Sequence, residues 1–340
     1  MTAVRSRWLA EGLSLLLRAD ELPGEVMAEA MRALTSGAAD EAESAAFLTA
    51  LAMKGETAGE IAVAVGVLRE KMVRLQAPAG NVIDTCGTGG DGSGTFNIST
   101  AVALVVAGAG CPVVKHGNRS VSSRSGSADV LRELGVPIEK GPAWSQQCLE
   151  RCGFAFCYAP HFHPCLAHVG PLRRKLGIRT IFNLLGPLLN PALATYQLLG
   201  VGKLELLEPL AGAVSRLGMK RAYLVSSADG LDEVSLSAAT HVREVVGTEV
   251  TGTTWNHCDF ELEPAWLDDM KADGPAASAV IIRAILDGHG GPARRIVLAN
   301  AAAALRAAGR AESLPAGVAI AAEAIDGGRA RKLLDDLTQS

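Results

Sequence analysis

Two glycine- and hydroxyl-rich segments between Asp84 and Asp129 carry the residue types that bind phosphate groups. Glycine lets the backbone approach a ligand closely, while hydroxyls, amides, Lys and Arg donate hydrogen bonds to phosphate oxygens. The first segment holds Gly87, Thr88, Gly89, Gly90, Asp91, Gly92, Thr95, Asn97, Ile98, Ser99 and Thr100. The second holds Lys115, His116, Gly117, Asn118, Arg119, Ser120, Val121, Ser122 and Ser123, with Ser127 shortly after. Two such segments in tandem indicate a ligand with more than one phosphate group.

An adjacent acidic pair, Asp232-Glu233, is a candidate metal site. The pair follows an apolar run at residues 222–225 on a glycine-containing loop, which predicts a position at the carboxyl end of a strand. Magnesium is commonly held by one or two carboxylates together with substrate phosphates. The alternative is a solvated loop pair without function, and spacing does not decide between the two.

A third group of candidates lies in the basic stretch 163–190, which contains His163, Arg173, Arg174, Lys175 and Arg179. A planar guanidinium can bind a carboxylate through two parallel hydrogen bonds, which Lys cannot reproduce. Most arginines in such runs are solvated, so spacing alone does not choose among Arg173, Arg174, Lys175 and Arg179.

Other phosphate motifs fit poorly. The pattern Gly87-x-Gly89-x-x-Gly92 matches a dinucleotide-binding fingerprint, but the acidic residue expected about 20 residues later is missing. Lys115 and His116 occupy that place instead, and no Gly-Lys-Ser/Thr follows as a Walker-type loop requires. A purely structural glycine turn remains possible for either segment alone.

Composition excludes several classes of protein. A chain of 340 residues predicts about two domains. A net charge of −4 gives no basic footprint for nucleic acid or a membrane surface. The apolar run 101–114 is shorter than the ~20 residues that span a bilayer. Glu11 and Arg18 interrupt the apolar N-terminal stretch, so we expect no cleaved signal peptide and a soluble cytoplasmic protein. The seven cysteines lack zinc-knuckle spacing and predict free thiols.

The pattern up to Leu75 is helical, with apolar residues at three- and four-residue intervals. Breaks near Pro23, Gly37 and Gly55 predict four helices, and Thr57 with Glu60 forms a capping box at the start of the fourth. Residues 76–80 read as a linker. We therefore predict a helical domain at residues 1–76.

Beyond the linker, apolar runs alternate with helical segments, which favours a mostly parallel sheet covered by helices. Both glycine-rich segments then leave the carboxyl ends of neighbouring strands, where open α/β sheets bind ligands, and each leads into a helix N-terminus. The stretch 163–190 fits this pattern poorly and is predicted to pack with the N-terminal helices. The larger domain therefore comprises residues 80–162 and 191–340. The predicted strands lie at residues 82–86, 112–114, 154–158, 196–201 and 222–225, and four helices are predicted within 277–337.

These motifs closely resemble those of the anthranilate phosphoribosyltransferases. The likeness rests on residues 87–91, 97–100, 115–127, 179–187, 232–233 and 281–286, and it covers nearly the whole chain beyond Asp84. It implies transfer of phosphoribose from phosphoribosyl pyrophosphate (PRPP) to the amine of anthranilate, in tryptophan biosynthesis. The implied fold is α/β of the nucleoside phosphorylase/phosphoribosyltransferase type, with a small all-helical domain that also forms the interface of a homodimer.

The resemblance also implies roles for individual residues. Gly87, Gly90, Asp91 and Ser127 would hold the pyrophosphate side of PRPP. Ser99, Asp232 and Glu233 would bind Mg²⁺, and Asn118 and Arg173 would bind anthranilate. The rest of the PRPP site would be Thr95, Asn97, Ile98, Ser99, Thr100 and the run 115–123. No catalytic acid or base is assigned.

Two alternatives from other classes remain at this point. A pyrimidine-nucleoside phosphorylase would share the architecture but would need residues that read a nucleobase in place of Asn118 and the Arg173 segment. A non-enzymatic relative that binds nucleic acid would need a basic cleft and no acidic pair. The charge of −4 and the intact Asp232-Glu233 pair disfavour the second alternative.

Overall fold

Local sequence signals delimit the N-terminal helices of the computed structural model, which describes residues 7–77, 81–120 and 125–339. The side chains of Asp40 and Thr57 each accept a hydrogen bond from the backbone N–H three residues on and form capping boxes. Gly37 and Gly55, which follow two of the helices, take positive φ angles of 74° and 86°. The four predicted helices are confirmed as α1 (Arg7–Leu16), α2 (Gly24–Ser36), α3 (Glu41–Lys54) and α4 (Ala58–Lys71).

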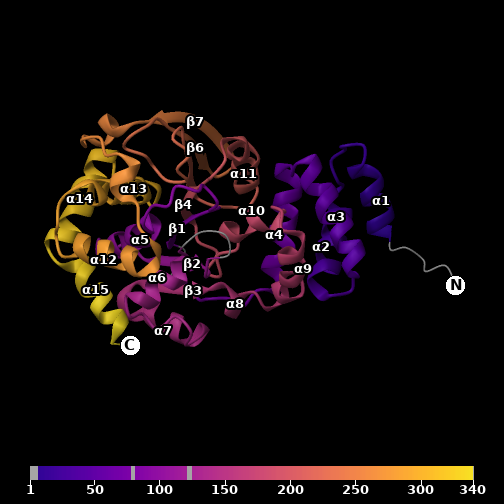
Figure 1. Ribbon diagram of the computed structural model, residues 1–340, viewed down its shortest axis with the longest axis horizontal. Coiled ribbons are helices and arrows are strands. Elements are labelled where there is room, and N and C mark those ends of the chain that lie inside the picture. The colour runs from indigo at the N-terminus through magenta and orange to yellow at the C-terminus, as the bar shows by residue number, and fades with distance from the viewer. Residues whose placement is uncertain (1–6, 78–80, 121–124, 340) are drawn as a thin grey trace.

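A seven-stranded sheet forms the centre of the larger lobe, with strand order β3-β2-β1-β4-β5-β6-β7 (Figure 1). The first five strands are parallel and confirm the predicted runs. They are β1 (Ile83–Gly87), β2 (Val113–Gly117), β3 (Phe154–Tyr158), β4 (Tyr196–Gly200) and β5 (Arg221–Ser227).

An antiparallel hairpin that the sequence analysis did not predict completes the sheet. It consists of β6 (Thr240–Val246) and β7 (Glu249–Trp255), and β6 pairs with β5. Gly247 in the connecting turn has a φ of 60°, which suits a tight hairpin. The alternation of apolar residues is weak because most of β7 is exposed, so the Gly247 turn was the only strong signal.

Helices cover the sheet and bury its main core. Helix α5 (Ile98–Gly108) is apolar on all sides because it lies between the sheet and the C-terminal helices. The four predicted tail helices are confirmed and lie at one end of the larger lobe (Figure 1). They are α12 (Gly274–Leu286), α13 (Pro292–Ala307), α14 (Leu314–Asp326) and α15 (Arg329–Thr338). The other helices of this lobe are α6 (Ser127–Glu133), α7 (Pro142–Cys152) and α11 (Leu207–Val214), with short helices η3 (Leu204–Leu206), η4 (His257–Phe260) and η5 (Leu267–Met270).

The stretch after β3 crosses to the helical lobe. Figure 1 shows α9 and α10 beside the N-terminal helices, and Val169, Leu172 and Phe182 share one buried cluster with the cores of α2 to α4. Arg69 of α4 donates from Nε and Nη2 to the carbonyl oxygen of Leu188 at 3.2 and 3.0 Å. On this packing we propose a helical domain of residues 1–76 and 163–190. The crossing elements are α8 (Ala159–Phe162), η1 (Pro164–His168), α9 (Gly170–Leu176), α10 (Phe182–Leu185) and η2 (Gly186–Leu188).

Two further features concern membrane-spanning helices and disulfide bonds. Within residues 7–77, 81–120 and 125–339, no helix is both long enough and apolar enough to cross a membrane. All seven cysteines are free thiols, and only Cys258 is exposed. The expectation of free, mostly buried thiols is confirmed.

Candidate functional site

The parallel strands bring the glycine-rich segments to one edge of the sheet. Gly87 at the end of β1 pairs with Gly200 at the end of β4, and β2 ends beside them at Gly117. The loop after β5 carries Asp232 and Glu233 to the same edge, because β5 runs parallel to β4. Residues from four separate parts of the sequence therefore meet at the carboxyl ends of the strands.

The first loop packs tightly against the acidic pair. A Cβ atom added at Gly87 would lie 2.6 Å from Oδ2 of Asp232, so a larger residue there would displace the Asp232 carboxylate. The backbone N–H of Gly89 donates to the same oxygen at 3.1 Å. Gly89 and Gly90 have φ angles of 64° and 75°, in the left-handed region that favours glycine. The loop therefore presents its backbone, with few side chains, to the space above it.

The acidic pair sits in an environment that opposes its charge. Burial, followed by the nearby charge of Asp91, raises the pKa of Asp232 to about 7. Burial, followed by the charge of Asp232, raises the pKa of Glu233 well above its usual value, while Lys115 and the backbone N–H of Ser99 act in the opposite direction. A divalent cation between these carboxylates would remove the repulsion and favour their charged forms.

Lys115 is almost completely buried below this edge. Its ammonium donates to the carbonyl oxygen of Thr85 at 2.5 Å and to Oγ of Ser99 at 3.2 Å. Burial lowers the pKa of Lys115, and the charges of Asp84 and Glu233 oppose that shift. The structure therefore brings Ser99, Lys115 and Glu233 together, and the lysine orients the Ser99 hydroxyl.

Asn97 ties the two loops and a tail helix together. Its Oδ1 accepts from Oγ of Ser125 at 2.8 Å and from Oγ of Ser278 at 3.1 Å, and its backbone N–H donates to Ser278 at 2.8 Å. Ser278 on α12 is fully buried, and nothing in its sequence context marked it. Asn97 thus holds the loops at a fixed separation.

The remaining predicted residues of the first segment lie at the edge or behind it. Ile98 and Thr100 point their side chains into the core, and their backbone N–H groups donate to Phe96 and Asn97. Thr95 forms an antiparallel bridge with Lys271, which fastens the loop to the segment before α12. Asp91 and Thr95 stay partly exposed beside the loop.

The described part of the second loop surrounds the start of α6. A Cβ atom added at Gly117 would collide with Oγ of Ser127, so these two predicted residues are in direct contact. The Asp129 carboxylate accepts from the backbone N–H groups of Ser120 and Gly126 at 3.0 and 3.2 Å. Asn118 is exposed at the rim. Val121, Ser122 and Ser123 lie outside the described residues.

Arg119 points to a different partner. Its guanidinium pairs with Glu139 and lies 5.9 Å from the ring centroid of Tyr158. Among the described contacts it therefore meets neither the first loop nor the acidic pair.

Two buried histidines join the second loop to the crossing segment. Nδ1 of His116 lies 3.0 Å from the carbonyl oxygen of Gly186, so this nitrogen carries the proton and donates. Nε2 of His116 is then the acceptor for Nε2–H of His163, at 3.1 Å. Burial lowers the pKa of His116 to about 3 and that of His163 to about 4, so both rings are neutral at physiological pH.

Asp84 and Asn190 make a buried contact that the sequence analysis missed. Nδ2 of Asn190 donates to Oδ2 of Asp84 at 2.8 Å and to the carbonyl oxygen of Val114 at 2.7 Å. Burial, the largest influence, raises the pKa of Asp84 to about 6. The contact fixes the point where the crossing segment returns to the sheet. The sequence does contain one signal for this contact, because Asp84 places a carboxylate within a mostly apolar strand.

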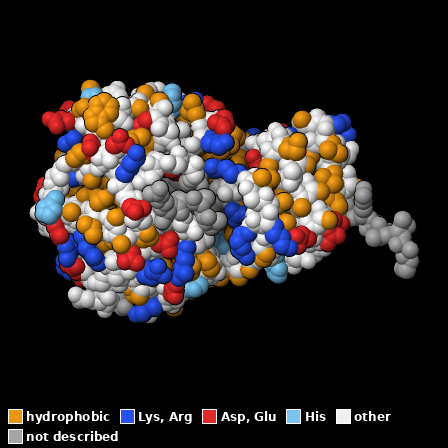
Figure 2. Space-filling view, viewed as in Figure 1, with side chains coloured by type: hydrophobic (Ala, Val, Ile, Leu, Met, Phe, Trp, Pro, Cys, Tyr) orange, Lys and Arg blue, Asp and Glu red, His pale blue; other side chains and the backbone are white. Residues whose placement is uncertain are grey.

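The structure separates the four basic residues of the crossing segment. Lys175 is exposed and pairs with Glu41 of the helical domain at 2.8 Å, and Arg174 is exposed. Arg173 is half-buried, with its guanidinium 5.6 Å from the ring centroid of Phe182. Arg179 lies against Gly90 of the first loop. Figure 2 shows Lys and Arg side chains gathered where the two lobes meet.

Comparisons with known proteins agree with this two-lobed arrangement. Residues 79–331 match the family described as "Glycosyl transferase family, a/b domain", and residues 11–72 match "Glycosyl transferase family, helical bundle domain". The anthranilate phosphoribosyltransferase of Methanosphaerula palustris is 47% identical over 331 residues, which cover 97% of each chain.

Solved structures give the same likeness. The anthranilate phosphoribosyltransferase of Thermus thermophilus matches with a TM-score of 0.90 and 40% identity, over 96% of this chain and 98% of that one. The Saccharomyces cerevisiae enzyme in complex with PRPP and Mg matches with a TM-score of 0.88 and 28% identity, over 97% of each chain. The same yeast enzyme in complex with 4-fluoroanthranilate gives a TM-score of 0.85 and 28% identity, also over 97% of each chain.

Proposed function

Because the chain belongs to the family of anthranilate phosphoribosyltransferases, we infer that it transfers the phosphoribosyl group of PRPP to the amine of anthranilate. The products are N-(5-phosphoribosyl)anthranilate and pyrophosphate, in tryptophan biosynthesis. The observation that carries this function is the meeting of the two phosphate-type loops with Asp232 and Glu233 at one sheet edge. That combination suits a diphosphate ester and its divalent cation.

The reaction separates charge, and groups in the site can stabilise the charge that develops. Breaking the bond to pyrophosphate leaves positive charge on the sugar and negative charge on the leaving group. The positive N-terminal end of the α5 dipole can stabilise the negative charge, whereas the backbone N–H groups of Thr88 and Gly89 already donate to Gly200 and Asp232. We propose that Asp232 and Glu233 hold Mg²⁺ with the Ser99 hydroxyl. When bound, Mg²⁺ neutralises charge on the pyrophosphate.

The attacking substrate, anthranilate, needs to be oriented in the site more than it needs to transfer a proton. The aromatic amine of anthranilate is already a nucleophile, so placing it against the anomeric carbon lowers the barrier without a strong base. The buried rings of His116 and His163 are neutral, and their hydrogen bonds to each other and to Gly186 hold the second loop against the crossing segment. We propose that Asn118 and Arg173 bind anthranilate beside them.

A direct assay tests the reaction. Purified protein with PRPP, Mg²⁺ and anthranilate should consume anthranilate fluorescence and release one pyrophosphate for each anthranilate lost. Release of a free base from a pyrimidine nucleoside by phosphate, without consumption of anthranilate, would instead support the phosphorylase alternative. Binding of nucleic acid without either activity would support the non-enzymatic one.

Substitution of Arg173 by Lys is expected to weaken anthranilate use specifically. Lys keeps the charge but loses the planar guanidinium that binds a carboxylate in two places. Loss of one charge-assisted hydrogen bond should raise the KM for anthranilate by roughly 10- to 100-fold, with a much smaller change for PRPP. Steady-state kinetics with each substrate varied in turn measures both constants. Arg174→Lys, at the exposed neighbouring position, is the control and should leave both constants unchanged. An unaltered anthranilate constant in Arg173→Lys would remove Arg173 from the acceptor site.

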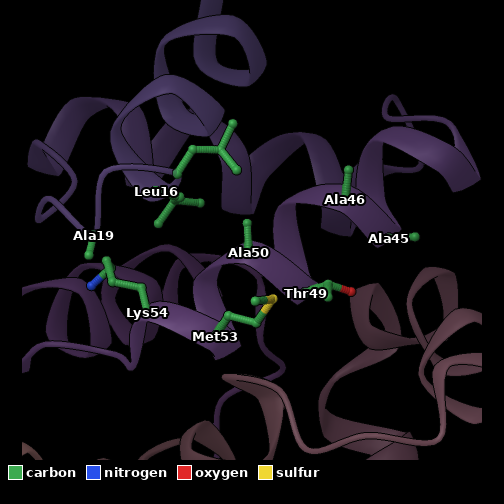
Figure 3. A pocket seen from close by; sticks show the side chains of 9 residues that line it. Leu16, Ala19, Ala45, Ala46, Thr49, Ala50, Met53 and Lys54 are labelled. Carbon is green, nitrogen blue, oxygen red and sulfur yellow. The ribbon is translucent and has the colours of Figure 1, made fainter.

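We further propose that the enzyme is a homodimer formed through the outer face of α1 and α3. Helix α3 buries one face and presents small apolar residues on the other, and Met53 on that outer face is 84% exposed. The residues drawn in Figure 3 surround a hollow of about 570 Å³ between the two helices. They include Leu16, Ala46, Ala50 and Met53. A helix that is apolar on both faces needs a second layer to cover it.

Charge placed in this hollow should separate the protomers. Ala46→Glu with Ala50→Glu is expected to convert the dimer to a monomer in sedimentation velocity, because two buried unpaired carboxylates oppose the contact. Ala276→Glu, which adds one carboxylate on the exposed side of α12, is the control and should stay dimeric. A double variant that sediments like the wild-type protein would place the interface elsewhere.

The compartment is also part of the proposal. Free thiols throughout the chain suit a reducing environment, and we propose that the enzyme works in the cytoplasm without nucleic-acid or membrane partners.

A further inference from the structure

Arg179 is a cation whose guanidinium has unmet hydrogen-bonding capacity. It lies between α9 and α10, where the crossing segment passes from the helical lobe toward the sheet edge. Its Nη2 atom is buried and has no hydrogen-bond partner among the described residues. No ion pair forms at Arg179 within the described ranges either, although a guanidinium offers five N–H donors. Leaving such a donor buried and unpaired is costly, so a bound anion is the natural partner.

The guanidinium rests on the phosphate loop. A Cβ atom added at Gly90 would lie 2.8 Å from Nη1 of Arg179 and 3.7 Å from Cζ. A larger residue at Gly90 would therefore be disfavoured by the φ of 75° and would displace the arginine side chain. The positive charge thus stands beside the loop that we propose to hold pyrophosphate.

The turn between α3 and α4 also lies near Arg179. Glu56 lies in the turn between α3 and α4, and burial, as the largest influence, raises the pKa of its carboxyl. The charge of Arg179 acts on Glu56 in the opposite direction, which places the two groups near each other. Arg179 therefore lies between the turn that joins α3 to α4 and the glycine loop.

We propose that Arg179 is a substrate-contact residue that binds the pyrophosphate group of PRPP. The proposal rests on the proposed function. Two anions could in principle occupy this position, the pyrophosphate or the carboxylate of anthranilate. The contact of Arg179 with Gly90 favours the pyrophosphate, because Gly90 belongs to the phosphate loop. Arg173, which we propose to bind the carboxylate of anthranilate, lies instead against Phe182 in another part of the crossing segment.

The position predicts an effect on catalysis as well as on binding. Negative charge on the pyrophosphate increases as its bond to the sugar breaks, so a cation in contact with it stabilises the transition state more than the ground state. Arg179→Gln should therefore lower kcat/KM for PRPP by roughly 10- to 100-fold, the loss expected for one charge-assisted contact. The KM for anthranilate should change by less than about threefold, a factor within the usual context dependence of one neutral contact.

Binding measurements separate this role from a structural one. Isothermal titration of the full-length enzyme with inorganic pyrophosphate and with PRPP, each with Mg²⁺, should show the same weakening in Arg179→Gln. Arg179→Lys should recover part of it, because the charge returns without the planar fork. Arg174→Gln, an exposed neighbour on α9, is the matched control and should bind both ligands as the wild type does.

The outcomes discriminate among the possible roles. Wild-type protein that binds neither PRPP nor pyrophosphate would overturn the proposed function itself. Wild-type binding together with unchanged pyrophosphate affinity in Arg179→Gln would overturn only the role of Arg179. A loss confined to the anthranilate constant would assign the arginine to the acceptor instead, and equal losses for both substrates with a lowered Tm would show a purely structural role.

Discussion

Replacing Asp232 by Asn together with Glu233 by Gln is expected to abolish turnover at physiological magnesium and to leave the fold intact. The amides keep the size of the side chains, and the amide oxygen introduced by Asp232→Asn can still accept from the Gly89 N–H that now donates to Asp232 at 3.1 Å. The change removes the charge that Mg²⁺ requires. We therefore expect activity to fall below detection at limiting Mg²⁺ while the circular dichroism spectrum is unchanged.

Stability provides an independent readout for the same variant. The pKa of Asp232 is raised from an ordinary value of 3.8 to about 7, so the folded state holds a proton that the unfolded state has already released. Stability of the metal-free wild type should therefore fall as pH rises from about 4 to about 7. The double variant lacks this loss, and its Tm in metal-free buffer should exceed that of the wild type at pH 8 by more than at pH 5.

An exposed acidic pair supplies the control. Asp268→Asn with Asp269→Asn removes two adjacent carboxylates from the surface helix η5 and should retain both activity and its magnesium dependence. Normal turnover in the Asp232/Glu233 variant at limiting Mg²⁺ would exclude these residues from the metal site.

Substitution of Gly200 by Ala should have the second large effect, although Gly200 contributes no functional group. A Cβ atom there would overlap the carbonyl oxygen of Asp232 and would lie 2.8 Å from its carbonyl carbon. Backbone on both sides is fixed by strand pairing, since Gly200 pairs with Gly87 and with Val225. The loop that carries Asp232 must therefore move away from the sheet edge.

The expected result is a combined loss of stability and activity. Forcing a methyl group into a packed site costs about 1–3 kcal/mol, which lowers the Tm by several degrees. We expect kcat/KM for PRPP to fall by at least roughly 100-fold, because an ångström of displacement at a reacting centre costs about that factor. Thermal unfolding and steady-state kinetics measure the two effects.

A second glycine isolates the effect of crowding. Gly66 lies inside α4 with nothing within 4 Å of an added Cβ, so Gly66→Ala should keep full activity and gain up to about 1 kcal/mol from helix propensity. A Gly200→Ala protein with the Tm and kinetics of the wild type would show that the Asp232 loop tolerates displacement.

Features of this protein that depend on neighbouring residues were predictable from the sequence. The capping box at Thr57 and Glu60, the five parallel strands and the four tail helices depend on caps, breaks and apolar runs within short windows. The position of both glycine-rich loops also followed, because parallel strands place their carboxyl ends at one edge. The hairpin of β6 and β7 was missed because an exposed edge strand carries little apolar pattern.

Contacts between distant residues were decided only by the tertiary structure. No local pattern brings Ser278 to Asn97, Asn190 to Asp84 or Gly186 to His116, since each pair joins segments far apart in the chain. The basic stretch 163–190 shows the same limit, because the spacing of its four cations did not indicate which of them contacts a ligand. Packing then turned Arg173 toward Phe182, placed Arg179 on Gly90 and left Arg174 in solvent. Residue type determines which chemistry a side chain can perform, whereas burial and neighbouring groups determine which of several identical side chains performs it.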